Sequence, residues 1–477
     1  MTVLILTLFE AALSPCLRAS VVRDVSVKNT SKLPISPARA AAFDILLRIE
    51  EQEAYASELL HASHLSKLLS ADRGLMTELV MGVLRWRSVL DNTISQASSQ
   101  KIRKLDPEVL TALRIAVYQL RWLERIPAHA AIHESVELVK RARKRSAAPF
   151  VNAVLRKLSS TSPEPPASEP DSPRELASRY AHPEWLVERW ARAFGIETAR
   201  LVCRHDQQIP TTTIRLRNQD AETQLTADGI ALSPGLLSRS ARRVQSGDVT
   251  QTRAFREGLI AIQDEASQLV AAIVGSGSTI LDCCAAPGGK TSILADRNPN
   301  ANILALELHP HRARLLRKLV RAGNVTIVSA DARQLPFSCE FDRVLADVPC
   351  SGTGTLARNP EIKWRLKPED LQGLQVRQIA ILASAMSRVA PGGKLVYSTC
   401  SLEQEENADV VQQALAQTQS FRLLNCREEL APLQKEGELV WKDLNSLISG
   451  PYLRTISGLH PCDGFFAAIL QRKTATQ

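Results

Sequence analysis

Two cysteines, Cys350 and Cys400, each follow a predicted strand of the chain. Cys350 ends the run Asp-Val-Pro-Cys at residues 347–350, and Cys400 stands in Ser-Thr-Cys-Ser at residues 398–401. The carboxyl ends of neighbouring parallel strands open on one crevice. A single buried cysteine is most often a small hydrophobic residue. Two cysteines at such ends, one of them near Asp347, indicate thiolate chemistry instead.

A thiolate and a carboxyl group at one crevice could activate a pyrimidine ring. Carbon 5 of a pyrimidine is a poor nucleophile, but addition of a thiolate to carbon 6 makes carbon 5 electron-rich. An acid or hydrogen-bond donor near ring N3 helps this addition, because negative charge builds there. Asp347 is the candidate for that group. Carbon 5 could then attack an electrophilic methyl group, after which a base removes the carbon 5 proton and the thiol leaves.

A turn with two adjacent glycines follows the first strand predicted in this part of the chain. Residues 284–290 read Cys-Ala-Ala-Pro-Gly-Gly-Lys and follow the apolar run 279–283. A doubly wound α/β sheet binds its ligand at this place. Gly289-Lys290-Thr291 fits the end of a phosphate-binding P-loop, but Cys284 stands where that motif needs glycine. The Gly-x-Gly-x-x-Gly pattern of dinucleotide sites is also absent, so the ligand need not be a phosphate.

Acidic residues mark the ends of the strands that follow. Glu307 ends the second predicted strand, Asp331 lies just past the third, and Asp347 ends the fourth. A carboxylate after the second strand suits a ribose diol, because its two oxygens accept from both hydroxyls. Asp331 could meet an adenine edge. One such acid alone would be interpreted as a helix cap or a solvated turn, but the ordered series predicts an adenosine ligand without a pyrophosphate. S-adenosyl-L-methionine fits this description.

The composition is that of a basic globular protein with more than one domain. The chain has 477 residues, 44% of them hydrophobic and 23% charged, with a net charge of +9. This charge favours a polyanionic partner. The cysteines are scattered, without clusters at zinc spacing, which predicts reduced thiols in a cytoplasmic protein and no bound metal. Residues 1–13 are apolar but too short to span a bilayer, so we expect no membrane partner; a monomer is the default.

The order of helical and strand patterns predicts several domains. The first of them shows apolar residues at helical spacing throughout, and its basic run at 140–145 could contact phosphates or be a solvated helix end. A stretch rich in Pro, Ser and Glu separates it from the rest. The predicted parts are a disordered extension (1–35), an all-α bundle (36–158), a linker (159–174), a small basic α+β unit that binds RNA (175–257) and an α/β Rossmann-like domain (258–473).

Strand and helix patterns alternate in the last domain, which implies a mostly parallel sheet with right-handed connections. We expect strands at 279–283, 302–307, 325–329, 343–347 and 394–398, helices at 290–296, 311–322, 369–389 and 403–416, and a final strand at 464–470.

Several motifs together resemble the RNA cytosine-5 methyltransferases of the Nol/Nop/Sun family, over roughly residues 175–473. The motifs are those at 263–267, 284–290, 347–350, 398–401 and 463–466. The resemblance implies a class I methyltransferase fold, a nucleophilic Cys400 and a Cys350 that assists product release. Glu307 replaces the usual Asp, and Val348 replaces a usual Ala. The implied S-adenosyl-L-methionine contacts are Cys284, Ala285, Ala286, Pro287, Gly288, Gly289, Lys290, Glu307, Asp331 and Asp347.

The helical part of the chain is similar to the NusB-like RNA-binding domain. The motifs that carry this resemblance lie at 72–73, 82–85, 126–136 and 150–156. A NusB-like domain fused to such a methyltransferase is the layout of bacterial enzymes that methylate small-subunit rRNA. The resemblance therefore implies 16S rRNA, naked or in early small-subunit particles, as the substrate and one specific cytosine as the target.

Three alternative functions fit parts of the same sequence. A DNA cytosine-5 methyltransferase would use Cys350 as its nucleophile, but the usual following Gln is missing and Cys400 would have no role. The methylated RNA could instead be another species, such as tRNA. A non-catalytic RNA-binding assembly factor would need only the helical domain and the basic patches, and would leave the cofactor turn and both thiols unexplained.

Overall fold

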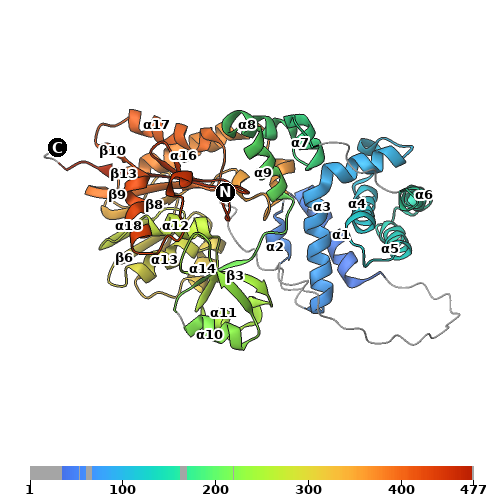
Figure 1. Cartoon of the computed structure of the whole chain (residues 1–477), viewed down its shortest axis with the longest axis horizontal. Coiled ribbons are helices and arrows are strands. Elements are labelled where there is room, and N and C mark those ends of the chain that lie inside the picture. The colour runs from blue at the N-terminus through green and yellow to red at the C-terminus, as the bar shows by residue number, and fades with distance from the viewer. Residues whose placement is uncertain (1–34, 53, 61–66, 162–168, 219, 475–477) are drawn as a thin grey trace. The chain divides into compact units, whose positions relative to one another are not determined.

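The computed structural model describes residues 35–474, with the exception of residues 53, 61–66, 162–168 and 219 (Figure 1). Residues 1–34 of the predicted extension lie outside the described residues, and so do residues 162–168 of the predicted linker. The described chain divides into two compact units, which meet in the sequence between Glu184 and Trp185. No helix in this part of the chain is long and apolar enough to cross a membrane.

The first unit is helical throughout its described residues, as the apolar spacing predicted. Its helices are α1 (Pro37–Gln52), α2 (Ala56–Leu60), α3 (Ser70–Ala97), α4 (Pro107–Trp122), α5 (Ala128–Arg141), α6 (Ala148–Ser159) and α7 (Pro173–Arg179). Helix α4 is the central one, because buried residues occur on nearly all of its sides and it packs against α1, α3, α5 and α6. Leu113, Ile115 and Val117 of α4 are fully buried in the common core.

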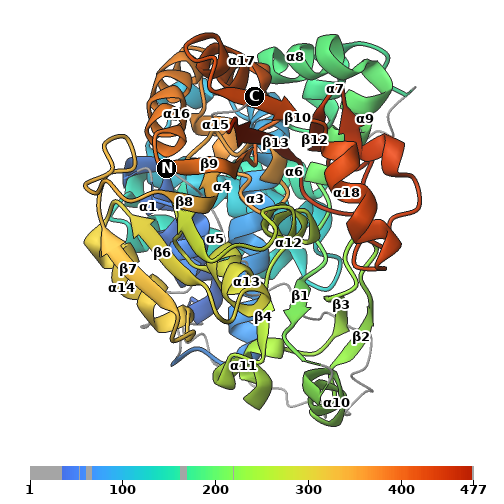
Figure 2. The same cartoon turned by 90° about the vertical axis from the view of Figure 1, so that its left-hand side faces the viewer.

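The second unit begins with two helices and a small antiparallel sheet. These elements are α8 (Glu184–Phe194), α9 (Ile196–Asp206), β1 (Thr213–Leu216), α10 (Asp220–Ala227), β2 (Ala231–Pro234), β3 (Ala241–Ser246), α11 (Arg253–Glu257) and β4 (Ile260–Ile262). The strands lie in the order β2-β3-β1-β4. Ile214, Leu225 and Ile260 contribute to a small core of their own. Figure 2 shows this sheet with α10 and α11 below the larger sheet of the same unit.

The larger sheet has a parallel half and an antiparallel half. The parallel strands are β5 (Thr279–Asp282), β6 (Asn302–Glu307), β7 (Val325–Ser329), β8 (Phe341–Asp347) and β9 (Val389–Thr399). They lie in the order β9-β8-β5-β6-β7, so the chain reverses its direction of travel across the sheet at β5. The crevice beyond β5 and β8 is therefore the expected ligand site of an open α/β sheet.

Strand β13 (Phe465–Arg472) joins the antiparallel half to the parallel half, because it pairs with β9. Strands β10 (Phe421–Leu424) and β12 (Tyr452–Thr455) pair with β13, and β11 (Ile448–Ser449) pairs with β12. The predicted final strand is confirmed, but the predicted sheet lacked these three short strands.

Helices cover both faces of the sheet, because side chains alternate along each strand. Ile280 and Leu345 pack on one face, in the cluster that also contains residues of α12 (Glu265–Ala272), α13 (Gly289–Arg297) and α18 (Cys426–Lys435). Leu281 and Val344 pack on the other face, with α16 (Asp370–Met386) and α17 (Ala408–Ala416). Two further helices are α14 (Pro310–Leu319) and the short α15 (Ile362–Arg365). This layered arrangement confirms the predicted Rossmann-like sheet.

Candidate active site

The glycine turn connects β5 to α13. Gly288 has a φ of 118°, in the left-handed region, and a Cβ atom built on it would lie 2.6 Å from Cγ2 of Val320. Ala285 and Ala286 pack against Leu316 and Val320, so they fill the space under α14. The Ala286–Pro287 peptide bond is cis, and α13 begins at Gly289. The turn is thus packed tightly on its α14 side.

A cavity of about 320 Å³ opens beside this turn, at the ends of β5, β6 and β7. Cys284, Glu307 and Asp331 line it, which brings together three of the residues predicted to contact the ligand. One oxygen of Glu307 accepts from the backbone N–H of His309, at 2.9 Å, and Asp331 forms an ion pair with Arg333 at 2.6 Å. The remaining lining residues are Cys283, Leu308, His309, Arg312, Ala330, Ala332, Arg333, Pro349, Arg377 and Ile381.

This lining fits an adenosine group. Two carboxylates at successive strand ends can accept from ribose hydroxyls and an adenine amino group, while Leu308, Pro349 and Ile381 supply apolar walls. The three arginines of the lining are functional candidates that the sequence did not indicate, because they come from separate segments. Arg333 is already paired with Asp331, and Arg312 lies 3.7 Å from Oε2 of Glu307, so two of these cations balance the carboxylates of the same cavity.

Asp347 and Lys290 form a buried ion pair outside this cavity. Nζ of Lys290 lies 2.8 Å from Oδ2 of Asp347, and Oγ of Ser398 donates to Oδ1 at 2.7 Å. The ammonium group also lies 5.0 Å from the centroid of the Phe465 ring. Both oxygens of the Asp347 carboxylate are therefore engaged, and its position at the end of β8 is fixed.

The two predicted cysteines meet at the ends of β8 and β9. Their Sγ atoms are 3.3 Å apart, and both side chains are buried. The pKa of Cys400 is raised well above its ordinary value, because its thiol is hydrogen-bonded to that of Cys350 and both are buried; the nearby ammonium of Lys290 acts in the opposite direction. In this state Cys400 is a neutral thiol, and it needs a change in its surroundings to become a nucleophile.

The motif near the carboxyl terminus supports the loop that follows Cys350. The N–H of Gly464 donates to the carbonyl oxygen of Gly354 at 2.8 Å, and the N–H of Gly354 donates to the carbonyl oxygen of Cys400 at 2.9 Å. A Cβ atom on Gly354 would clash with the carbonyl group of Gly464. Glycine is needed at position 354 because two backbones touch there.

A buried charge cluster joins the motif at 263–267 to the same region. Arg358 lies 2.9 Å from Oδ2 of Asp463 and 3.5 Å from Oδ2 of Asp264. Asp264 also accepts from the backbone N–H of Asp463, at 3.2 Å, and caps α12 through the N–H of Ala266. Burial raises the pKa of Asp463 to about 7, against the effect of Arg358. These contacts give the motif a structural role.

Known proteins that are similar to this chain identify its family. A family model described as 16S rRNA methyltransferase RsmB/F matches residues 273–471, and the NusB family model matches residues 36–160. The chain is 36% identical over 455 residues to the probable ribosomal RNA small subunit methyltransferase B of Bacillus subtilis, covering 91% of this chain and 98% of that protein. The chain belongs to the RsmB/F family of rRNA methyltransferases.

A second relative and two solved structures are also similar to this chain. The ribosomal RNA small subunit methyltransferase B of Vibrio cholerae is 31% identical, over 91% of this chain and 97% of its own. The crystal structure of PH0851 has a TM-score of 0.75 at 23% identity, covering 93% of this chain and all of that one. A methyltransferase homolog protein from Pyrococcus horikoshii has a TM-score of 0.52 at 25% identity and covers 62% of this chain and 98% of its own. The NusB-like bundle and the methyltransferase sheet are both shown by the two family models, and the structure of PH0851 spans both.

Proposed function

We propose that this RsmB/F protein methylates carbon 5 of one specific cytosine in 16S rRNA, through a transient bond between Sγ of Cys400 and carbon 6 of the base. The observation that supports this most strongly is the convergence of two thiols and a fixed lysine–aspartate pair at the ends of β8 and β9. The names of the relatives, which act on small-subunit rRNA, support the choice of RNA.

We assign S-adenosyl-L-methionine to the acid-lined cavity and to the turn at residues 284–290. Glu307 and Asp331 would hold the adenosine group. When bound there, this cofactor supplies an electrophilic methyl group. We further assign a hydrogen-bonding role toward the cytosine to Asp347, with Lys290 supplying positive charge where the ring becomes negative.

Cys350 is the proposed partner of Cys400 in the later steps. After methylation, the carbon 5 proton must leave and the bond between Cys400 and carbon 6 must break. A second thiol only 3.3 Å from the first can exchange a proton with it, and its replacement would slow release of the product. The same hydrogen bond holds Cys400 in its neutral form before the RNA binds. Entry of the base between the thiols would remove that restraint.

The NusB-like unit is the proposed RNA-binding part, but only some of its basic run at 140–145 is available for phosphates. Lys140 pairs with Glu137 of the same helix, Arg141 with Asp44 of α1, and Lys144 with Asp106. Arg141, Arg143 and Arg145 of the run are all exposed, and Arg143 and Arg145 lie outside these ion pairs. These two residues are the cations of the run that we expect to contact RNA most directly.

Bisulfite sequencing of total RNA from cells with and without the gene tests this function. We expect the loss of one 5-methylcytosine in 16S rRNA. Loss of a 5-methylcytosine in tRNA instead would support the alternative substrate. If no site is lost, and calorimetry detects no S-adenosyl-L-methionine binding at millimolar ligand, the protein is a non-catalytic assembly factor.

A further inference from the structure

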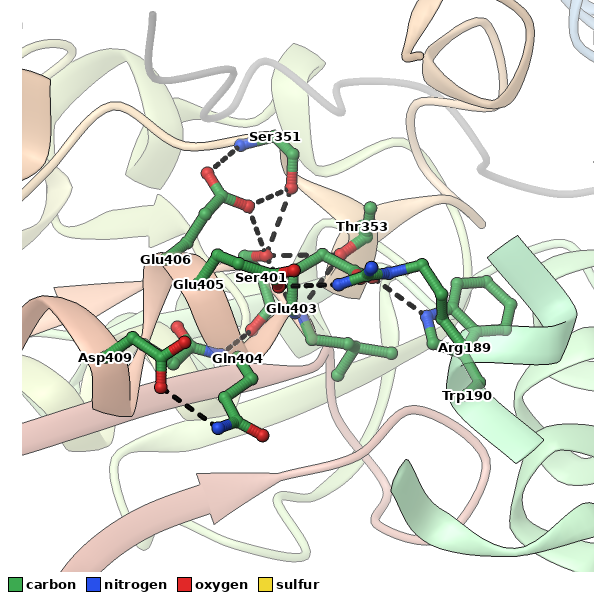
Figure 3. Close-up of polar contacts among 12 residues, drawn as sticks. Arg189, Trp190, Ser351, Thr353, Ser401, Glu403, Gln404, Glu405, Glu406 and Asp409 are labelled. Atoms are coloured by element: carbon green, nitrogen blue, oxygen red, sulfur yellow. Dashed lines mark hydrogen bonds and ion pairs between the residues drawn. The ribbon is translucent and has the colours of Figure 1, made fainter. Parts of the chain in front are cut away.

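Glu406 is a buried carboxylate that binds both cysteine-bearing loops (Figure 3). Its Oε1 atom accepts from the backbone N–H of Ser351 and from Nε2 of Gln378, both at 2.8 Å. Its Oε2 atom accepts from the hydroxyl of Ser401 at 2.5 Å and from the hydroxyl of Ser351. One side chain thus uses both of its oxygens to join segments that are far apart in the sequence.

The residues that Glu406 holds are the immediate neighbours of the two cysteines. Ser351 follows Cys350, and Ser401 follows Cys400. The two serine hydroxyls are themselves 3.0 Å apart. Because each serine is joined to its cysteine by one peptide bond, a shift of either serine would move the corresponding Sγ atom. We propose that Glu406 is a positioning residue that sets the separation of the two thiols and so couples adduct formation to product release.

The surroundings of Glu406 keep its carboxylate in one place. The hydroxyl of Tyr397 donates to the backbone carbonyl oxygen of Glu406 at 2.6 Å. Nδ2 of the next residue, Asn407, donates to the carbonyl oxygen of Ser401 at 2.8 Å. Gln378 donates to the carbonyl oxygen of Pro349 at 2.9 Å as well as to Glu406, so the Cys350 loop is held on both sides of the cysteine.

Neighbouring acids differ from Glu406 in their partners. Glu403 and Glu405 both pair with Arg189, and Glu403 also accepts from the indole N–H of Trp190 (Figure 3). The side-chain donors to Glu406 described above are hydroxyl and amide groups. A carboxylate accepts from all of them at once, because it has only acceptor sites. Such an arrangement suits a residue that fixes geometry.

The variant Glu406→Gln removes the negative charge of this side chain but can keep the geometry of its hydrogen bonds. Its carbonyl oxygen could still accept from Ser351 N–H and Gln378, while its NH₂ group could donate to the two serine hydroxyls, which can rotate and accept. Alanine would remove every one of these bonds. Tyr397→Phe is the matched control, since it removes a buried hydrogen bond to the same residue without changing a contact to Ser351 or Ser401.

The proposal rests on the proposed function and predicts a specific kinetic defect. Cys400 can form its adduct alone, but release needs Cys350 at the right distance. In single-turnover reactions with 16S rRNA transcript and S-adenosyl-L-methionine, Glu406→Ala should therefore accumulate a covalent enzyme–RNA complex, seen on a denaturing gel, and we expect the same of Cys350→Ser. We expect release to be slowed by ~10- to 100-fold, since misplacements of this kind change rates by such factors. Glu406→Gln should release at nearly the wild-type rate.

The controls distinguish failure of this inference from failure of the proposed function. If wild type forms no adduct on a 5-fluorocytosine transcript, the proposed function fails. Only the role of Glu406 is overturned if wild type and Cys350→Ser form this adduct and Glu406→Ala gives one of two results. Either Glu406→Ala loses adduct formation and product release in parallel, or it behaves like the control variant Tyr397→Phe. Should Glu406→Ala not fold, the double variant Ser351→Ala/Ser401→Ala removes both hydroxyl bonds and should show the same slow release; normal release would contradict the proposal.

Discussion

Nζ of Lys290, in the first turn of α13, lies 2.8 Å from Oδ2 of Asp347, at the end of β8, and both side chains are buried. This pair links the turn proposed to hold the cofactor to the strand that leads to Cys350. A buried charge that loses its partner is strongly unfavourable, whereas a pair replaced by neutral groups need not be. Replacing one partner alone should therefore destabilise the protein more than replacing both partners by neutral residues.

Lys290→Met should destabilise the protein by about 3–5 kcal/mol, because it leaves the Asp347 carboxylate buried without its cation. The free energy of unfolding, measured by chemical denaturation, checks this. Adding Asp347→Asn to Lys290→Met should restore much of the loss. If the single variant is as stable as wild type, the carboxylate is not held by this lysine in solution.

Asp282 should make the stability depend on pH. Burial raises its pKa from an ordinary 3.8 to about 7, so the folded protein holds a proton that the unfolded chain has already released. The stability that protonated Asp282 contributes to the folded protein is therefore lost as the pH rises from 3.8 through about 7. Between pH 5 and pH 8 this amounts to roughly 2–3 kcal/mol.

Asp282→Asn removes this titration while keeping an oxygen that can accept from Thr291, which donates to Asp282 at 2.7 Å. Denaturation curves at pH 5 and pH 8 should show a smaller fall in stability for the variant than for wild type. Equal falls for the two proteins would show that Asp282 does not titrate in this range.

Gly354→Ala should destabilise the protein by about 2–4 kcal/mol, because the added methyl group meets the backbone of Gly464 and one of the two segments must move. The melting temperature reports this. Gly373→Ala, in α16, is the control, since no atom lies within 4 Å of its Cβ position; it should be neutral or slightly stabilising. A neutral Gly354→Ala would contradict the backbone contact.

Glu307→Gln and Asp331→Asn should each weaken S-adenosyl-L-methionine binding by roughly tenfold, because each loses a charged acceptor in the cavity. Isothermal calorimetry measures this, with the exposed Glu436→Gln as control. Unchanged binding in both cavity variants would place the ligand elsewhere.

The local features of the site could be predicted from the sequence, but its long-range contacts could not. The strand, the turn and the start of α13 are contiguous, so residues 279–290 were sufficient to predict them. The pairing of Lys290 with Asp347 joins positions 57 residues apart, and no local pattern reports it. The same holds for Glu406, whose acidic neighbours in the sequence pair with Arg189 instead.

The differences in the fold have similar physical causes. Strands β10, β11 and β12 are short and depend on pairing with β13 or with each other, so their own sequences carry little alternation. Helices α7 and α8 are separated by residues 180–183, which are not helical. Pro183 disfavours a helical conformation of the residue before it. Tertiary contacts and this proline outweigh the local apolar spacing.

Cys400 is proposed to form a covalent bond to the target base, and a trapping reaction measures this bond directly. With S-adenosyl-L-methionine and a 16S rRNA transcript that carries 5-fluorocytosine, carbon 5 has no proton to lose, so the adduct should persist on a denaturing gel. We expect wild type and Cys350→Ser to give this adduct, with mass spectrometry locating it at residue 400, and Cys400→Ser to give none. An adduct that persists in Cys400→Ser, or one located at Cys350, would show that Cys400 is not the nucleophile.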